Sequence, residues 1–392
     1  MKNKRFFSLA VLITVCMAAM LLCTACGDSS GGSDAADSQS TGAQAPKIDG
    51  LTFSERVELD YAEQFDIFRY EDGYTVIDTH EDTKFLVVPE GKETPEGLDE
   101  SIAVVQQPAG NIYLAATSAM SLFDAMGGID NVTMTSVNAD GWTVDAAVKA
   151  LKSGKMTYAG KYNQPDYELI LDKGCDLVIE STMIYHNPEV KEMLEELGMT
   201  VFVDRSSYES NPLGRTEWIK AYGVLAGREE EAAAYFEKQK EVIRELEDLE
   251  NTGKTVAFFY VTTDGKVVVR SSHDYVSTMI KMAGGKYAFD GIKDEEGKAS
   301  VSMTMESFYE TAVDADYIIY NGSIDFSVRS LDDLIAKDEI FKRFKAVKEG
   351  HCYTTGNSMY QRTDVISNMI MDFHKILTEE DPGEMDFLTK ME

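Results

Sequence analysis

Alternating apolar and polar residues dominate residues 51–98 and predict short β-strands. The runs 65–70 and 74–77 flank Asp72-Gly73, and a further strand ends at residue 89. An Asp-Gly pair between two alternating runs is typical of a tight hairpin turn. The first part of the folded chain is therefore expected to contain a β-hairpin.

From about residue 102 the pattern changes, because short apolar runs now alternate with segments of helical period. Strands are predicted over 111–116, 132–137, 176–180 and 200–203. Helices are predicted over 118–126, 143–152, 166–173 and 188–197. Glycines close three of these helices, as is common at helix ends. Strands that alternate with helices indicate parallel pairing with helical crossovers.

The next segment is helical, over 213–226 and 228–250, with little β pattern between. If continuous, the second helix is roughly 35 Å long, enough to bridge two lobes. The βα alternation then resumes. It predicts strands over 255–261, 266–270, 316–320 and 352–354 and helices over 275–283, 306–312, 331–336, 340–344 and 364–377. We predict an α/β fold of two βα lobes, 51–212 and 253–392, with largely parallel sheets. A helical segment at 213–252 joins them, and a ligand cleft lies between them.

The first 26 residues predict a secretory signal. Lys2, Lys4 and Arg5 precede an apolar run that ends at Leu22, and small residues lead to Cys26. This end looks like a lipobox, although Cys23 stands where leucine is usual. A transmembrane anchor is the alternative, because the run is near the lower limit for spanning. Residues 27–50, rich in Gly, Ser, Ala and Asp, predict a flexible tether. Acyl chains on Cys26 would hold the chain to the outer face of a cell membrane.

The net charge is −31, with 68 acidic and 37 basic residues. Nucleic-acid binding is disfavoured, because neutralising phosphates requires basic patches. Beyond the signal only Cys175 and Cys352 remain. Cys175 lies beside an apolar strand and is expected to be a small buried hydrophobe rather than half of a disulfide, although the pair remains open.

Several stretches resemble the substrate-binding lipoproteins of ABC importers, in the class that carries iron-siderophores, haem and cobalamin. The stretch 166–179 is similar to that family's "E-x-I-x-x-L-x-P-D-L-V-I", with Gly174-Cys175 in place of the proline region. Residues 192–201 resemble its "L-x-x-x-G-I-P-V", and 275–285 resemble the start of its second lobe. Residues 305–319 resemble a repeat of the first stretch.

This resemblance implies two lobes joined by one long helix, with a cleft and a small hinge motion between them. It also implies docking on a membrane permease through one acidic residue of each lobe, which by position are Glu168 and Glu306. Permease arginines would complete charge-assisted pairs with them. Each glutamate also opens a helix, where the helix dipole favours a carboxylate, so a purely structural role is the alternative.

Ligand-binding residues are expected at the carboxyl ends of the strands and in the loops that face the cleft. In the first lobe these are Ser118, Trp142, Tyr162, Met183, Tyr185, Arg205 and Tyr208. In the second lobe they are Arg270, Ser271, His273, Tyr360 and Arg362, and Arg215 opens the connecting segment. Arginine with aromatic faces suits an anionic, planar or catecholate ligand. The alternative is that each arginine pairs with a nearby carboxylate such as Asp204, Glu209 or Asp364.

Other functions are less favoured. The five histidines, His80, His186, His273, His351 and His374, are isolated in sequence, so no metal site is predicted. Haem would need an iron ligand such as Tyr185, Tyr208 or His273. No catalytic or nucleotide-binding motif is present, so an enzyme is not expected. Cobalamin or another nutrient, or a sensor or adhesin on the same fold, remains open. We expect a monomer without a cofactor whose partners are a small ligand, most favourably an iron complex, a permease and the bilayer.

Overall fold

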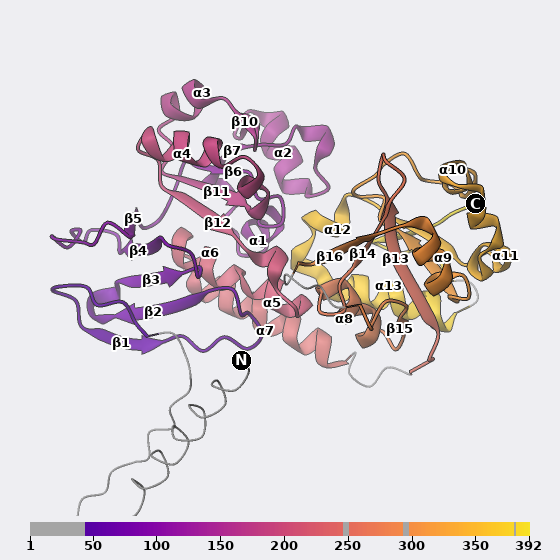
Figure 1. Cartoon of the computed structure of the whole chain (residues 1–392). Coiled ribbons are helices and arrows are strands. Elements are labelled where there is room, and N and C mark those ends of the chain that lie inside the picture. The colour runs from indigo at the N-terminus through magenta and orange to yellow at the C-terminus, as the bar shows by residue number, and fades with distance from the viewer. Residues whose placement is uncertain (1–43, 246–250, 293–297, 380–381) are drawn as a thin grey trace, which may run out of the picture. The chain divides into compact units, whose positions relative to one another are not determined.

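The computed structural model describes residues 44–245, 251–292, 298–379 and 382–392 (Figure 1). The predicted signal peptide, Cys26 and most of the tether lie outside these residues. No helix in these ranges is long and apolar enough to cross a membrane. Ile48, within the predicted tether, is buried against the first sheet, so packed structure begins before residue 51.

An N-terminal sheet precedes both lobes. Its order is β1 (Phe53–Arg56), β2 (Asp66–Tyr70), β3 (Thr75–Asp78), β4 (Lys84–Val88) and β5 (Ile102–Gln106), antiparallel except for the parallel pair β4–β5. The β2–β3 hairpin is confirmed: Asp72 and Gly73 have φ of 63° and 86°. Positive φ at consecutive turn residues matches the twist of a tight hairpin, and Asp-Gly tolerates it.

The N-terminal lobe contains a fully parallel sheet in the order β12-β11-β6-β7-β8. The strands are β6 (Ile112–Leu114), β7 (Val132–Thr135), β8 (Thr157–Tyr158), β11 (Leu177–Ser181) and β12 (Val201–Asp204). Helices α1 (Met120–Ala125), α2 (Asp145–Ser153), α3 (Tyr167–Asp172) and α4 (Pro188–Glu196) connect them, with a small hairpin of β9 (Gly160–Lys161) and β10 (Gln164–Pro165). The predicted βα order is confirmed, with boundaries shifted by a few residues.

Alternation along β11 explains why this sheet is buried on both faces. Leu177 and Ile179 belong to the main core, whereas Val178 belongs to a second core on the opposite face. Successive side chains of a strand point to opposite faces, so a continuous apolar run fits a strand covered on both sides. Glu180, the next residue, is buried without interrupting the strand.

Three helices form the connecting segment: α5 (Pro212–Glu217), α6 (Ile219–Ala226) and α7 (Glu229–Glu245). Gly227 ends α6 with a φ of 68°, and α6 and α7 pack against each other. Helix α7, the predicted bridging helix, buries Ala232, Phe236 and Ile243, as its period predicts. Residues 246–250 of the predicted helix lie outside the described residues.

The C-terminal lobe is built on a mixed sheet in the order β16-β14-β13-β17-β18-β19, with β15 beside the start of β13. Its strands are β13 (Thr255–Val261), β14 (Val267–Arg270), β15 (Lys286–Tyr287), β16 (Ser300–Met303), β17 (Tyr317–Tyr320), β18 (Cys352–Thr355) and β19 (Leu388–Lys390). Its helices are α8 (Tyr275–Met282), α9 (Met305–Ala312), α10 (Leu331–Lys337), α11 (Lys345–Glu349), α12 (Ser358–Gln361) and α13 (Ile366–Thr378).

The central strands β13, β17 and β18 of this sheet are parallel. Strand β14 pairs antiparallel with both β13 and β16, and β19 pairs antiparallel with β18. The connection from Val261 to Val267 is too short for a helical crossover, so β14 returns beside β13 as a hairpin. The predicted strand is therefore present, but it is not part of a βα unit.

Two buried glutamates fasten the N-terminal sheet to the start of the connecting segment. The Glu217 carboxylate accepts hydrogen bonds from the backbone N–H groups of Asp60, Tyr61 and Ala62, each at 2.8 Å. Glu209 accepts the N–H groups of residues 63 and 64 at 2.8 and 3.1 Å and the Trp218 indole at 2.8 Å. Burial nevertheless raises the pKa of Glu209 to about 7, because these donors only partly offset desolvation.

Candidate functional site

The carboxyl ends of β6 and β12, which flank β11, lie at the same edge of the sheet in the N-terminal lobe, because all three strands are parallel. There the Ser118 hydroxyl donates to Asp204 at 2.6 Å. Asp204 lies near the Tyr222 hydroxyl, and burial together with this negative charge raises the pKa of Tyr222. Ser118 thus has a protein partner, and the arrangement forms the inner wall of the site.

Arg205 follows β12 and lies within a set of protein groups. Its Nη1 pairs with the Glu81 carboxylate, and its Nη2 donates to the Gln64 side chain at 3.2 Å. Its guanidinium lies 5.4 Å from the centre of the Tyr208 ring, and Tyr185 donates to Glu81 at 2.8 Å. The carboxylate that pairs with Arg205 comes from the N-terminal sheet, not from the sequence neighbours considered above.

Arg215 lies deep at the junction of the lobes. It is 3% exposed, and its guanidinium lies 4.1 Å from the centre of the Tyr275 ring. Its Nε has no hydrogen-bond partner, and within the described ranges Arg215 forms no ion pair. Helix α5 packs on α8, which brings a connecting-segment arginine onto an aromatic residue of the C-terminal lobe.

Arg270 continues this cluster in the C-terminal lobe. Its Nη2 donates to the Tyr360 hydroxyl at 2.7 Å, and its Nη1 lies 3.6 Å from an Asp274 oxygen. Asp274 also caps α8 by accepting the Val276 N–H at 2.9 Å. Burial raises the pKa of Asp274, while the nearby arginines lower it. Two guanidinium groups thus share one carboxylate, and the cluster favours an anion.

A cavity of about 140 Å³ opens beside Arg270. Its walls include Tyr260, Asn321, Ile324 and Tyr360. The Tyr360 hydroxyl accepts from Arg270 and, at 2.8 Å, from the Asn321 amide. Since both of its lone pairs then face donors, its own proton remains free to be donated to a bound group.

Large apolar side chains are exposed near the strand ends of both lobes. They are Met183, Tyr185 and Tyr208 in the N-terminal lobe and Ile324 and Phe326 in the C-terminal lobe. Exposed apolar groups gathered at strand ends mark a surface that binds something apolar or aromatic. Three residues of this region, Asn321, Ile324 and Phe326, were not identified from the sequence. Their position directly after β17 could have identified them, because ligand residues are expected at strand ends.

Other predicted site residues have different surroundings. Trp142 is 6% exposed and donates to the Val137 carbonyl at 3.1 Å, so it packs in the core instead of offering a face to the cleft. Arg362 forms a two-pronged pair with Asp364 at 2.9 and 3.0 Å, the structural alternative anticipated for it. Tyr162 packs against the second core, Ser271 is buried and His273 is exposed.

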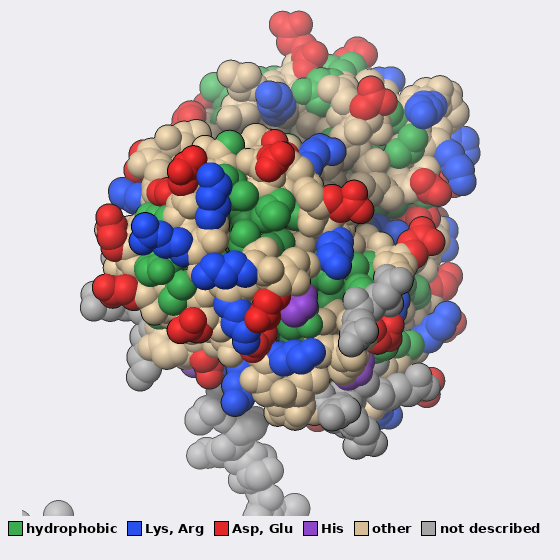
Figure 2. Space-filling view, turned by 90° about the vertical axis from the view of Figure 1, so that its right-hand side faces the viewer, with side chains coloured by type: hydrophobic (Ala, Val, Ile, Leu, Met, Phe, Trp, Pro, Cys, Tyr) green, Lys and Arg blue, Asp and Glu red, His purple; other side chains and the backbone are tan. Residues whose placement is uncertain are grey.

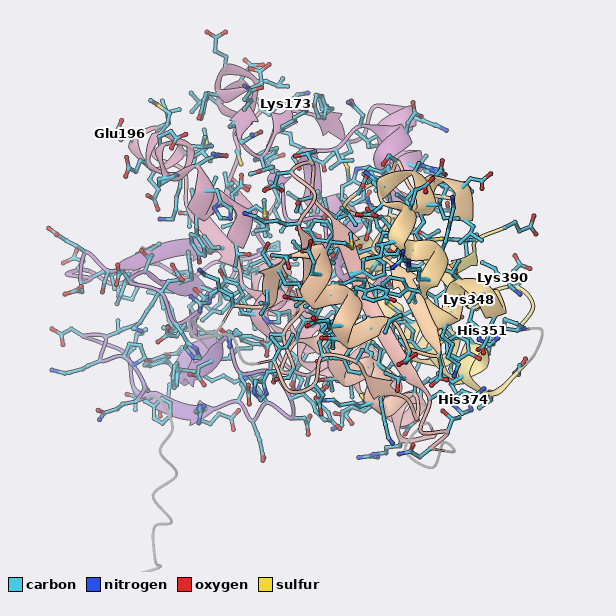
Figure 3. The ribbon with its side chains drawn as sticks, turned by 45° about the vertical axis from the view of Figure 1, so that its right-hand side comes forward. Lys173, Glu196, Lys348, His351, His374 and Lys390 are labelled. Carbon is cyan, nitrogen blue, oxygen red and sulfur yellow. The ribbon has the colours of Figure 1, made fainter. Side chains whose placement is uncertain are left out.

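The histidines and cysteines that the structure describes do not gather into a metal site. His351 stacks on Tyr317 with 4.6 Å between the ring centres, and His374 contacts the Ala283 carbonyl at 3.0 Å (Figure 3). No cluster of three His, Cys, Asp or Glu that could hold a metal occurs in the part of the chain that the structure describes. Cys175 and Cys352 are both free.

Charge on the surface is mixed. Figure 2 shows basic and acidic side chains interspersed on the face it presents, despite the net charge of −31. Glu168 and Glu306 are both exposed in the first turns of α3 and α9. Lys173 and Glu196, labelled in Figure 3, mark the ends of α3 and α4. The docking role of both glutamates stays a prediction.

The arrangement of two βα lobes with arginine and aromatic groups at their junction is that of a solute-binding protein. Residues 112–359 match the model of the family described as periplasmic binding protein, and the chain belongs to that family. The resemblance to the substrate-binding lipoproteins of ABC importers is confirmed, and the chain is a binding protein, not an enzyme.

Three relatives illustrate the match. An uncharacterized lipoprotein of Methanocaldococcus jannaschii is 24% identical over 351 residues, covering 82% of each chain. A periplasmic haem-binding protein of Pseudomonas aeruginosa superposes with a TM-score of 0.57 at 15% identity, covering 73% of this chain and 98% of that one. An ABC-type Fe³⁺-hydroxamate transport protein of Saccharomonospora viridis gives 0.55 at 17% identity, over 69% and 94%. The structural matches confirm the two-lobed fold.

Proposed function

We propose that this chain is the extracytoplasmic lipoprotein of an ABC importer and that it captures an anionic iron complex, a ferric siderophore or haem, between its lobes. The observation that carries the proposal is Arg215. It is a buried guanidinium without an ion pair among the described residues, stacked on Tyr275 where the lobes meet. The complex would then be delivered to a membrane permease.

Arg215 and Arg270 share the one carboxylate of Asp274, so positive charge stays incompletely balanced in the interior, at a cost on the order of several kcal/mol. A bound anionic group would offset that cost through charge-assisted hydrogen bonds, and Arg270 lies within the same cluster. The ligand therefore supplies the charge that the fold leaves out. A neutral-surfaced corrinoid would gain nothing from two guanidinium groups, which disfavours the cobalamin alternative.

Aromatic groups support the same ligand class. Tyr275 and Tyr360 lie on either side of Arg270, each with its ring centre 5.9 Å from the guanidinium, and Tyr208 is exposed beside Arg205. Flat faces next to guanidinium groups suit catecholate or porphyrin rings. That proteins of this fold bind haem or take part in Fe³⁺-hydroxamate transport also favours an iron complex.

Anchoring and delivery complete the proposal. Acylated Cys26 would hold the chain to the bilayer, and the tether would let the lobes reach a permease. Exposed Glu168 and Glu306, one on each lobe, would pair with permease arginines. The lipoprotein relative supports this location.

The test is the ligand that co-purifies with the full-length chain from iron-limited cells. We expect a visible absorption band with one iron per chain, at a porphyrin or ferric-siderophore wavelength. A corrinoid spectrum, or a bound ligand without iron, would contradict the proposal.

The ligand affinity of two variants then tests the role of Arg215. Arg215→Met keeps the length of the side chain and removes the charge, so we expect about tenfold weaker binding without a lower melting temperature. Arg362→Met, whose guanidinium is occupied by Asp364, is the matched control and should bind normally. Unchanged affinity in Arg215→Met would remove this residue from the site.

A further inference from the structure

The turn between β3 and β4 reaches the strand ends of the N-terminal lobe. It comprises residues 79–83 and belongs to the N-terminal sheet, which precedes the segment that matches the family. Glu81 in this turn receives both the Arg205 guanidinium and the Tyr185 hydroxyl. Two residues predicted to contact the ligand thus already hold a carboxylate of the protein.

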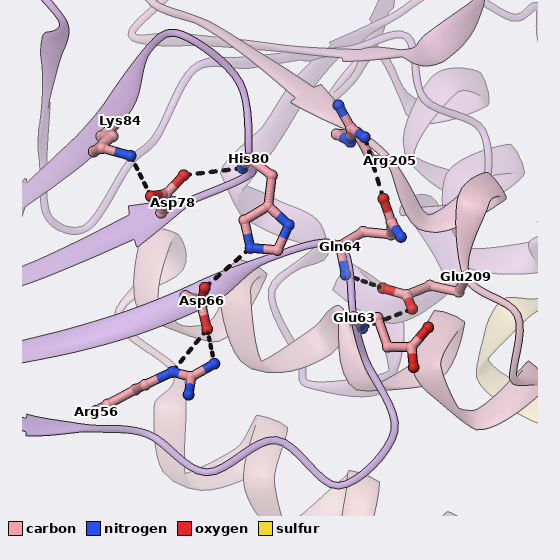
Figure 4. A network of polar contacts seen from close by, with 9 residues as sticks. All are labelled: Arg56, Glu63, Gln64, Asp66, Asp78, His80, Lys84, Arg205 and Glu209. Atoms are coloured by element: carbon pink, nitrogen blue, oxygen red, sulfur yellow. Dashed lines mark hydrogen bonds and ion pairs between the residues drawn. The ribbon is translucent and has the colours of Figure 1, made fainter. Parts of the chain in front are cut away.

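This turn is firmly built. His80 has a φ of 58°, its N–H donates to Asp78 at 2.9 Å, and its ring nitrogen lies 3.0 Å from an Asp66 oxygen (Figure 4). Lys84 pairs with Asp78 from the next strand, and both aspartates are buried. His80 and Lys84, which stand on either side of Glu81 in the sequence, are thus held by two buried aspartates. These contacts keep the Glu81 side chain next to Arg205.

Two of the three guanidinium nitrogens of Arg205 are held by the protein, Nη1 by Glu81 and Nη2 by Gln64, whereas Nε has no hydrogen-bond partner. The centre of the Tyr208 ring lies 5.4 Å from the guanidinium, and Figure 4 shows the contact between Arg205 and Gln64. The Nη1 group of Arg205, which holds Glu81, can pair with a carboxylate or catecholate of a ligand only in competition with Glu81. An acidic ligand group that uses Arg205 must therefore replace Glu81 or share the cation with it.

We propose that Glu81 is a specificity-determining residue of the ligand site, because its carboxylate fills the anion position on Arg205 and Tyr185. The inference rests on the proposed function in taking Arg205 as a ligand residue. The turn thereby neutralises Arg205 in the free protein. Anions that bind Arg205 more weakly than Glu81 does are excluded from the site. Only a ligand with a strongly binding acidic group displaces Glu81.

The first test uses citrate alone, with no iron, on the full-length chain. In Glu81→Gln the Arg205 position is open, so citrate should raise the melting temperature by about 2 °C more than in the wild type at equal ionic strength. Adding Arg205→Gln should abolish this gain. Glu96→Gln, which changes an exposed carboxylate in the connection between β4 and β5, is the matched control. A response of Glu81→Gln equal to that of Glu96→Gln would overturn the proposal.

The second test compares a trianionic ferric tris-catecholate with a neutral ferric tris-hydroxamate. Glu81→Gln should bind the anionic complex about fivefold more tightly at low salt and the neutral complex within about twofold of wild type. Weaker or unchanged binding of the anionic complex would refute the role of Glu81. If the wild type binds neither complex nor haemin, the proposed function fails, while the citrate test still decides the role of Glu81. Tyr185→Phe should shift both tests in the same direction by less, and it provides a second variant if Glu81→Gln is poorly folded.

Discussion

Replacing Glu180 should change how the stability of this protein depends on pH. Glu180 lies in β11, an interior strand of the sheet in the N-terminal lobe, is 0% exposed, and neither of its carboxylate oxygens has a hydrogen-bond partner. Burial raises the pKa of Glu180 well above 4.5, and the nearby Ser181 backbone N–H, which forms no hydrogen bond with it, offsets this only partly. The nearby Tyr113 also has a raised pKa, chiefly from burial and then from the charge of Glu180. The folded protein therefore holds a proton that the unfolded chain releases.

The sign and size follow from proton linkage. A carboxyl whose pKa is raised by folding stabilises the protein fully below its unfolded pKa, about 4.3, and this stabilisation is lost as the pH rises toward the folded pKa. Between these two pKa values the unfolding free energy falls by about 1.4 kcal/mol for each pH unit. Glu180→Gln fills the same space without a titrating group, so this contribution is absent from the variant.

The measurement is urea unfolding at pH 5, 6 and 7. The difference in unfolding free energy between Glu180→Gln and the wild type should grow in favour of the variant by up to about 1.4 kcal/mol per pH unit until the folded pKa is reached. Other buried carboxyl groups, such as Glu209, are present in both proteins and cancel in the difference. Glu192→Gln on the exposed face of α4 is the control and should leave the profile unchanged. Parallel pH profiles for Glu180→Gln and the wild type would refute the reasoning.

Three further outcomes are expected. Glu217→Gln should destabilise the chain by about 2–4 kcal/mol in urea unfolding, because an amide cannot accept three backbone N–H groups as a carboxylate does, whereas exposed Glu231→Gln should be neutral. The double variant Glu168→Arg, Glu306→Arg should stop uptake but preserve ligand binding, and the charge-matched pair Asp172→Arg, Glu310→Arg on the same helices should transport normally; transport by the first pair would end the docking assignment. Cys26→Ser should move the protein from the membrane to the soluble fraction, and retention in the membrane would favour an uncleaved transmembrane anchor.

The local pattern of apolar and polar residues predicted most of the fold, because each strand and each helix has its own characteristic hydrophobic period. The β11 segment shows where such reasoning also reveals an anomaly: a charged residue at position 180, within a run buried on both faces, already implied a buried carboxyl. The β14 hairpin shows the limit of such reasoning, because the hydrophobic period of a strand does not indicate whether it runs parallel or antiparallel to its neighbour. Only the short connection from residue 261 to residue 267 indicated antiparallel pairing.

The site was harder to predict because its contacts join distant segments. Arg215 was a candidate only through its position, and its partner Tyr275 is set by the packing of α5 on α8. Arg362 and Trp142 were chosen by residue type, but Asp364 and the core already satisfy them. The Glu81 turn was missed because no local signal in the strands 75–78 and 84–88 tells which lobe their turn will contact.

The attachment of the N-terminal sheet bears directly on how Glu81 acts. Glu209 and Glu217, which hold backbone groups of residues 60–64, lie on either side of Arg215 in the sequence. The sheet is thus fixed to the segment that follows β12 and carries Arg215, and its turn meets the N-terminal lobe at Arg205. Glu209 and the contact between Glu81 and Arg205 attach the sheet to the end of β12, so the sheet would travel with the N-terminal lobe in a hinge motion. The contact between Glu81 and Arg205 would then persist through opening and closing, and only a competing anion, not the hinge motion, would release Arg205.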